Sequence, residues 1–209
     1  MRYTINARSN ALLTLTLLWC LVAAGCEPSV RLEPLDRNAT VLAFGDSLTS
    51  GYGADTEQAY PALLQTLISR TVINAGVPGE ISREGLRRLP ALLKQYRPDL
   101  VIICHGGNDI LRRLDLQQTS DNIQRMIELS HSNGAQVVLV GVPEYGVFLS
   151  SAAFYTELAE ANRLPIENDV ISDVLKRAAL KADRVHPNGE GYAVIAERLS
   201  VMLKNADAI

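Results

Sequence analysis

The feature that most constrains the fold is a series of short apolar runs separated by segments with helical periodicity. The runs are TVLAF (40–44), TVINAG (71–76), DLVIICHG (99–106) and AQVVLVGV (135–142). They are largely continuous, which is typical of strands buried on both faces of a sheet. The segments 59–69, 82–96, 120–132 and 189–205 are instead apolar at helical spacing. The sequence therefore predicts an α/β fold, a three-layer α/β/α sandwich with a central parallel sheet.

The stretch 143–182 is less regular. Helices are predicted over 150–164 and 170–179, and a short strand near Leu164 to Ile166. A chain of 209 residues suits one folded domain of ordinary size.

The N-terminus has the pattern of an export signal. Arg2 and Arg8 precede an uncharged apolar run, 11–26, that ends in Ala-Ala-Gly-Cys. The run has the length of a signal-peptide core and is short for a membrane-spanning helix. Its end resembles the bacterial lipobox, where the signal is cut before a cysteine that carries lipid. A conventional cleavable signal and an uncleaved anchor are the alternatives.

These features predict three segments: a lipoprotein signal peptide (1–25), the lipidated Cys26 with a polar tether (26–38), and one folded domain (39–209). The protein is expected to lie in the cell envelope, where the lipid on Cys26 would anchor it. Glu27 after the cysteine, rather than aspartate, favours the outer membrane facing the periplasm in a Gram-negative cell.

The charge and the cysteine content argue against a nucleic-acid-binding protein and against a disulfide-bonded fold. The formal net charge is −3 and the basic residues are dispersed, so no nucleic-acid partner is expected. Once Cys26 is lipidated and Cys20 is removed with the signal, Cys104 is the remaining thiol, so no internal disulfide is possible. Cys104 lies in an apolar run and is predicted to be buried and unreactive.

Polar residues follow the apolar runs where parallel strands end, at the edge of the sheet where ligands bind. Ser47 follows the first run, Gly79 the second and Asn108 the third, while Asp183 and His186 precede the last helix. A serine nucleophile requires a base and an acid that orients it. His186, with Asp183 three residues upstream, is the predicted base.

The other two histidines have simpler interpretations. His131 lies at a predicted helix C-terminus, where capping explains it, and His105 is expected to be a buried, hydrogen-bonded side chain. The oxyanion of an acyl-transfer reaction needs preorganised donors. The Ser47 N–H, a glycine N–H and the Asn108 amide can supply them, with Gly79 and Gly76 as competing glycines. Asp46 and Asp109 are predicted to brace the turns by accepting N–H groups.

The blocks GDSLTSGYG, NAGVPGE, GGND and DRVHPN together resemble the SGNH (GDSL) hydrolase superfamily, over about residues 40 to 203. The similarity is greatest to exported bacterial thioesterase/lysophospholipase and arylesterase members. It implies a flavodoxin-like sandwich, Ser47 as the nucleophile, and Gly79 rather than Gly76 as the oxyanion glycine. It also explains why the G-x-S-x-G elbow of other serine hydrolases is absent.

The resemblance implies a serine esterase that cleaves acyl esters or thioesters through an acyl-serine intermediate. No cofactor or metal is expected, since no cluster has ligand spacing. A carbohydrate or peptidoglycan O-acetyl esterase is the alternative substrate class, and a non-catalytic ligand-binding lipoprotein is the alternative outside enzymes. Arg112 and Arg113 could contact an anionic head group or be solvated. Four aromatic residues could line an acyl pocket or a buried helix face: Tyr145, Phe148, Phe154 and Tyr155.

Overall fold

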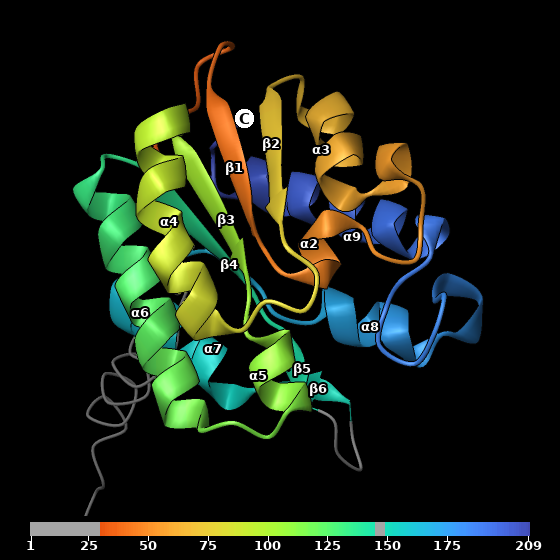
Figure 1. Cartoon of the computed structure of the whole chain (residues 1–209). Coiled ribbons are helices and arrows are strands. Elements are labelled where there is room, and N and C mark those ends of the chain that lie inside the picture. The colour runs from red at the N-terminus through yellow and green to blue at the C-terminus, as the bar shows by residue number, and fades with distance from the viewer. Residues whose placement is uncertain (1–29, 145–148) are drawn as a thin grey trace, which may run out of the picture.

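The computed structural model describes residues 30–144 and 149–209, which form a parallel sheet covered by helices (Figure 1). The sheet has five strands in the order β2-β1-β3-β4-β7. Their bounds are β1 Thr40–Gly45, β2 Thr71–Gly76, β3 Leu100–Cys104, β4 Gln136–Val140 and β7 Ile166–Glu167. The chain starts in the middle of the sheet and builds outward in both directions, as in the predicted flavodoxin-like fold. The predicted fold class is confirmed.

The central strands are buried because both of their faces are covered. Val41 of β1 pairs with Val72 of β2 on one side and with Leu100 of β3 on the other. Every residue of β3 is buried, and so is β1 after its first residue. This explains why these strands appear in the sequence as continuous apolar runs.

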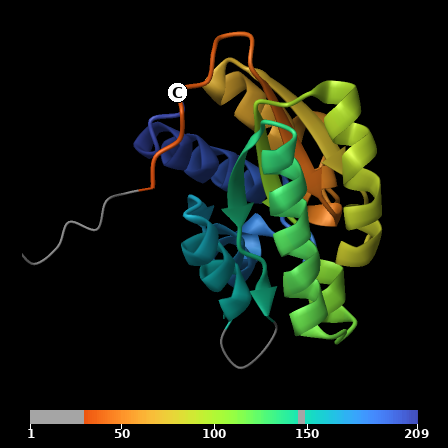
Figure 2. The same cartoon turned by 90° about the vertical axis from the view of Figure 1, so that its left-hand side faces the viewer.

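Two helix pairs form the outer layers. Helix α3 (Tyr60–Ile68) packs on α9 (Gly189–Asn205), and α4 (Ser82–Tyr96) packs on α6 (Leu116–Ser132). Figure 2 shows α4 and α6 on one side of the sheet and α9 on the other. In α4, Leu89 and Leu93 are buried at a spacing of four residues, which places one face of the helix on the core.

The irregular stretch contains short elements. Strands β5 (Pro143–Glu144) and β6 (Ser150–Ser151) pair antiparallel, and α7 (Ala153–Asn162) follows them. The predicted helix over 150–164 begins later than expected because its first residues pair as β6. The predicted short strand is β7, and α8 (Val170–Lys176) lies against α9. The described chain also has two short 3₁₀ helices, Thr56–Gln58 and Ala178–Leu180.

The described part of the predicted tether is bonded to the domain. The Leu32 and Leu35 N–H groups donate to the carbonyls of Ala206 and Ala208, both at 2.8 Å, and Leu35 is buried. These leucines are apolar residues in a polar stretch, and burying them against the C-terminal segment removes them from water. The predicted signal peptide and Cys26 lie outside the described residues. Across the described ranges, none of the helices has the length and apolar character needed to span a bilayer.

Candidate active site

Ser47 is the first residue of a helix that the sequence did not predict, α2 (Ser47–Ser50), directly after β1. The buried Asp46 carboxylate caps this helix by accepting from the Leu48 N–H at 3.1 Å. A residue at the first helical position has no intrahelical partner for its N–H. The end of β1 therefore presents both the Ser47 hydroxyl and its backbone N–H at the carboxyl edge of the sheet.

Ser47, His186 and Asp183 form a hydrogen-bonded series. His186 Nε2 lies 3.0 Å from Ser47 Oγ, and His186 Nδ1 lies 2.8 Å from Asp183 Oδ2. A carboxylate can only accept, so Nδ1 carries the proton and the Nε2 lone pair faces the serine hydroxyl. The structure thus brings together three residues that are up to 139 positions apart in the chain.

The loop before α9 holds the Asp183 carboxylate in its ionised form. Asp183 Oδ1 accepts from the backbone N–H groups of Val185 (2.8 Å) and His186 (2.9 Å). Partial burial alone would raise the pKa of Asp183, but these hydrogen bonds and the His186 ring together hold the pKa below its usual value. The acid is therefore a permanent partner for the imidazole at neutral pH.

Tyr52 is a residue at this site that the sequence analysis missed. Its ring centroid lies 4.5 Å from that of His186, and its carbonyl accepts from the Tyr192 hydroxyl at 2.9 Å. Tyr52 is 55% exposed, which places it at the mouth of the site. Its ring lies against one face of the His186 imidazole. The available signal was an aromatic residue between two glycines in the Ser47 block.

Gly79 lies on a loop that is hydrogen-bonded to the helix of Asn108. Asn108, in the short helix α5 (Gly107–Leu111), donates from Nδ2 to the Glu80 carbonyl at 3.0 Å. Arg112 Nη2 donates to the Gly79 carbonyl at 2.8 Å, a contact that the solvated interpretation of Arg112 did not include. Gly79 has φ +79°, a backbone conformation that favours glycine.

Gly76 has a different role. Its N–H donates to Asn74 Oδ1 at 3.0 Å, and a Cβ there would lie 2.1 Å from the Ser50 nitrogen. Gly76 is thus needed for close packing of β2 on α2, and its donor is already used. Between the two competing glycines, this geometry favours Gly79 as an oxyanion donor.

The other polar residues considered in the sequence have structural positions in the fold. Asp109 is buried and accepts from the Ser82 N–H (2.8 Å) and hydroxyl (2.7 Å), which ties α5 to the start of α4. His105 is fully buried with hydrogen-bond partners on both ring nitrogens. His131 is in the last turn of α6, where a positive charge interacts favourably with the helix dipole. Cys104 is buried, and burial raises the pKa of its thiol well above the usual value, so it is unreactive.

The described aromatic residues of the irregular stretch form a buried helix face. Phe154 and Tyr155 are both buried in α7, and the Tyr155 hydroxyl donates to the His105 carbonyl at 2.6 Å. They are not free to line an acyl pocket. Tyr145 and Phe148 lie outside the described residues.

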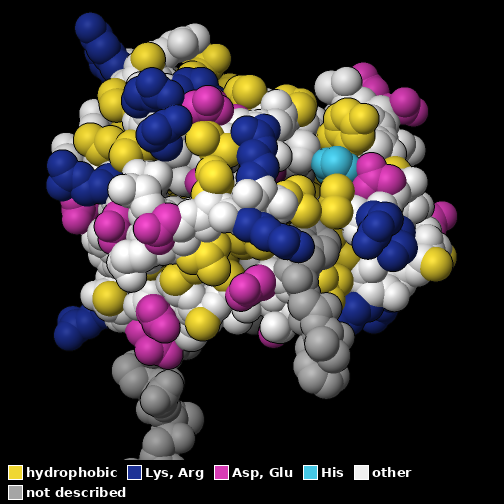
Figure 3. Space-filling view, turned by 60° about the horizontal axis from the view of Figure 1, so that its bottom comes forward, with side chains coloured by type: hydrophobic (Ala, Val, Ile, Leu, Met, Phe, Trp, Pro, Cys, Tyr) yellow, Lys and Arg dark blue, Asp and Glu magenta, His cyan; other side chains and the backbone are white. Residues whose placement is uncertain are grey.

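Two hollows that share Leu111 lie near the serine. Ser47, Asn108 and His186 line one small pocket together with Leu111. Leu111 also borders a larger cavity of about 450 Å³, whose other described lining residues are Ile110, Arg113, Leu114, Leu116 and Glu144. Figure 3, which brings the carboxyl ends of the strands forward, shows a histidine at the surface between apolar and acidic side chains. Among the residues that the structure describes, no three His, Cys, Asp or Glu side chains gather as a metal site.

A serine, an imidazole and a carboxylate bonded in series at the carboxyl edge of a doubly wound sheet define a serine hydrolase on an α/β/α fold. Residues 43–194 match the model of the GDSL-like Lipase/Acylhydrolase family, and the chain belongs to this family. It is accordingly an enzyme, a hydrolase of carboxylic ester or thioester bonds.

Known relatives agree with this assignment over most of the chain. An arylesterase of Vibrio mimicus is 34% identical over 197 residues, covering 89% of this chain and 94% of the relative. The thioesterase 1/protease 1/lysophospholipase L1 of Escherichia coli (strain K12) is also 34% identical, over 79% of this chain and 83% of its own. The crystal structure of the psychrotrophic esterase EstA from Pseudoalteromonas sp. superposes with a TM-score of 0.72 at 30% identity, covering 80% of this chain and 98% of EstA.

Proposed function

We propose that this chain cleaves acyl esters and thioesters with Ser47 as the nucleophile, His186 as the general base and Asp183 as the acid that orients it. The observation that carries the proposal is the pair of contacts at the two ring nitrogens of His186, 3.0 Å to Ser47 Oγ and 2.8 Å to Asp183 Oδ2.

In the first half of the reaction, His186 Nε2 takes the hydroxyl proton while Ser47 Oγ attacks the carbonyl carbon. The tetrahedral intermediate collapses when His186 returns that proton to the leaving alcohol or thiol, which leaves an acyl-serine. In the second half, His186 takes a proton from water, the hydroxide attacks the acyl carbon, and the proton goes to Ser47 Oγ as the acid departs.

The oxyanion of both tetrahedral intermediates would be stabilised by the N–H groups of Ser47 and Gly79 and by the Asn108 amide. An amide nitrogen has two protons, and in this structure Asn108 uses one on the Glu80 carbonyl. The second proton is available to the substrate. Losing one such donor lowers kcat by about 10²–10³-fold in other serine hydrolases.

A fluorophosphonate probe tests the nucleophile. The wild-type protein should be labelled and Ser47→Ala should not, while His186→Ala should be labelled much more slowly. Ser132→Ala, which removes a serine on α6, should label normally. Labelling of Ser47→Ala at the wild-type rate would refute this nucleophile, and an unlabelled wild type would favour the non-catalytic binder.

The cavity that Leu111 connects to the Ser47 pocket favours an acyl chain longer than acetyl. Leu111 and Leu114 are 46% and 40% exposed, and they offer apolar surface that an acyl chain would cover. A carbohydrate O-acetyl group would leave this surface open to water. We therefore favour acyl esters and thioesters over O-acetylated glycans.

A series of p-nitrophenyl esters from C2 to C16 tests the chain length. The wild type should have its highest kcat/KM above C2, and Leu114→Trp, which fills the cavity, should move the optimum to shorter chains. Hydrolysis of the C2 ester should change little in that variant. A wild-type optimum at C2, with activity on acetylated sugars, would support the O-acetyl esterase instead.

We also propose that the enzyme is anchored to the cell envelope by lipid on Cys26. The apolar run 11–26 ending in Ala-Ala-Gly-Cys, with Arg2 and Arg8 before it, supports this proposal. The full chain produced in bacteria with an alkyne-tagged fatty acid should carry the tag and sediment with membranes. Cys26→Ser should lose the tag. An untagged wild-type protein would contradict the anchor and leave the enzymatic proposal unaffected.

A further inference from the structure

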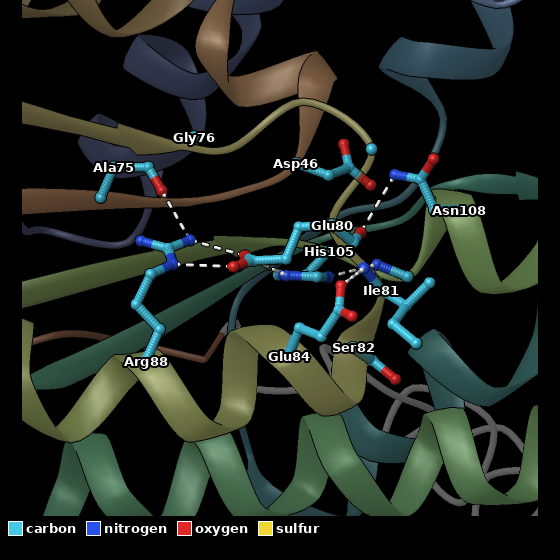
Figure 4. Close-up of polar contacts among 12 residues, drawn as sticks. Asp46, Ala75, Gly76, Glu80, Ile81, Ser82, Glu84, Arg88, His105 and Asn108 are labelled. Atoms are coloured by element: carbon cyan, nitrogen blue, oxygen red, sulfur yellow. Dashed lines mark hydrogen bonds and ion pairs between the residues drawn. The ribbon is translucent and has the colours of Figure 1, made fainter.

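Glu80 is a buried carboxylate held by two side chains from other elements. Its carboxylate accepts from Arg88 of α4 through Nε (2.9 Å) and Nη2 (2.6 Å), and from His105 Nε2 at 3.1 Å. Glu80 is 7% exposed and His105 is fully buried. Figure 4 shows Arg88 and His105 converging on the Glu80 carboxylate.

The partners of Glu80 are themselves fixed. His105 Nδ1 accepts from the Gly106 N–H at 2.9 Å, so the proton is on Nε2 and is donated to Glu80. Arg88 Nη2 also donates to the Ala75 carbonyl at 3.1 Å, and its guanidinium lies 4.6 Å from the centre of the Phe44 ring. Burial would raise the pKa of Glu80, but the His105 and Arg88 hydrogen bonds hold it at about 2. The carboxylate is thus anchored at one orientation.

Glu80 also contacts both segments that carry the proposed oxyanion donors, the Gly79 loop and the helix of Asn108. Gly79 directly precedes Glu80 in the chain, so the anchored side chain restrains the peptide that follows the Gly79 N–H. The Glu80 carbonyl accepts one proton of the Asn108 amide at 3.0 Å, as Figure 4 shows. The position of this carbonyl decides where the second amide proton points.

We infer that Glu80 is a positioning residue for catalysis: its ion pair with Arg88 and its hydrogen bond from His105 hold the Gly79 N–H and the Asn108 amide at the oxyanion. This inference rests on the proposed function. Donors that stabilise a transition state must be in place before the charge develops, so a small displacement lowers kcat more than it affects substrate binding. A residue that only stabilised the fold would not act selectively on kcat.

Glu167 offers a matched control. It is 7% exposed and accepts from Arg198 Nη2 (2.9 Å) and Nε (3.2 Å), but it lies on β7, at the edge of the sheet opposite β2. Glu80→Gln and Glu167→Gln therefore each replace a buried, arginine-paired carboxylate by a neutral isostere. Both should lower the melting temperature.

The experiment compares steady-state hydrolysis of p-nitrophenyl butyrate by the two variants. Glu80→Gln should lower kcat by about 10–100-fold with KM within about twofold of wild type, while Glu167→Gln should leave kcat within about twofold. In the double variant Glu80→Gln with Asn108→Ala, the loss should be smaller than the product of the single losses, because both changes act on the same donor.

Equal effects of Glu80→Gln and Glu167→Gln on kcat, or a fully multiplicative double variant, would overturn the inference. If Glu80→Gln does not fold, Arg88→Lys retains the charge but removes the two-pronged contact, and an unchanged kcat in that variant would overturn it as well. Ser47→Ala serves as a separate reference: activity that persists in Ser47→Ala refutes the proposed nucleophile, whatever Glu80→Gln does.

Discussion

The His186 imidazole is restrained on its two ring nitrogens and on one face of its ring. Asp183 accepts from Nδ1, Ser47 faces Nε2, and the Tyr52 ring lies against the imidazole. Asp183 is itself fixed by two backbone N–H groups three residues or fewer away. A short loop thus sets both the orientation and the tautomer of the His186 imidazole.

Asp183→Asn should lower kcat by about 10²–10⁴-fold with little loss of stability. An asparagine can donate to Nδ1, which would move the imidazole proton to Nε2, where it cannot accept from the serine. The measurement is kcat against pH from 5 to 9 for wild type and variant. The matched control is Asp173→Asn, which changes a partly exposed carboxylate that pairs with Lys176 and should retain wild-type kcat. A variant with more than a third of wild-type kcat would contradict the orienting role of Asp183.

The site residues that the sequence could propose are those whose chemistry is local or belongs to a recognisable block. Ser47, Asn108, Asp183 and His186 were predicted because each stands in a short motif. Tyr52 and Glu80 were missed, and the contact of Arg112 with Gly79 was not foreseen, because these contacts depend on distant partners. Arg112 meets Gly79 from 33 positions away, and Glu80 meets His105 from 25. No local pattern encodes these contacts.

At the level of elements, the close approach of α4 to His105, the residue directly after β3, depends on Gly85. A Cβ at this position would lie 2.3 Å from His105 Nε2 and 2.9 Å from its Cδ2. The missing side chain lets the helix approach close enough for Arg88 and His105 to reach the same carboxylate.

Gly85→Ala should therefore destabilise the protein despite the higher helix propensity of alanine. The propensity gain is about 1 kcal/mol, whereas forcing a buried ring to move costs about 1–3 kcal/mol. We expect a net loss of stability in urea unfolding and a lower kcat, because the His105 contact to Glu80 is disturbed. Gln95→Ala, at an exposed position of the same helix, changes propensity alone and should be neutral or slightly stabilising. A Gly85→Ala variant more stable than wild type would contradict the close approach.

The longer elements were predictable because each has several turns or a continuous apolar run. Strands β1, β3 and β4 and helices α3, α4, α6 and α9 all lie close to their predicted ranges. Helices α2 and α5 were not predicted, since four or five residues are too few to show a 3.6-residue period. The two-residue strands β5 and β6 exist through pairing and have no pattern of their own.

At the scale of the whole molecule, the buried carboxylate of Glu80 makes the stability of the protein depend on pH. Glu80 has a pKa of about 2 in the folded protein, well below the 4.5 that is ordinary for a glutamate. A carboxyl group whose folded pKa is lowered contributes stability above its unfolded pKa, and this contribution disappears as the pH falls through the folded pKa. Acid should therefore weaken the fold through Glu80 between about pH 5 and pH 2.

Glu80→Gln should make stability less dependent on pH. The side chain of the variant cannot ionise, so the contribution of Glu80, about 2 kcal/mol between pH 7 and pH 3, is absent from its pH dependence. Urea unfolding at pH 7, 5, 4 and 3 should give a shallower decline for the variant than for wild type, although the variant is less stable at pH 7. The pKa of Asp183 is also lowered, but Asp183 is present in both proteins and its effect cancels in the comparison. Parallel declines would mean that the Glu80 carboxylate is not stabilised by Arg88 and His105 in solution, and the anchoring of the Gly79 loop would then lose its physical basis.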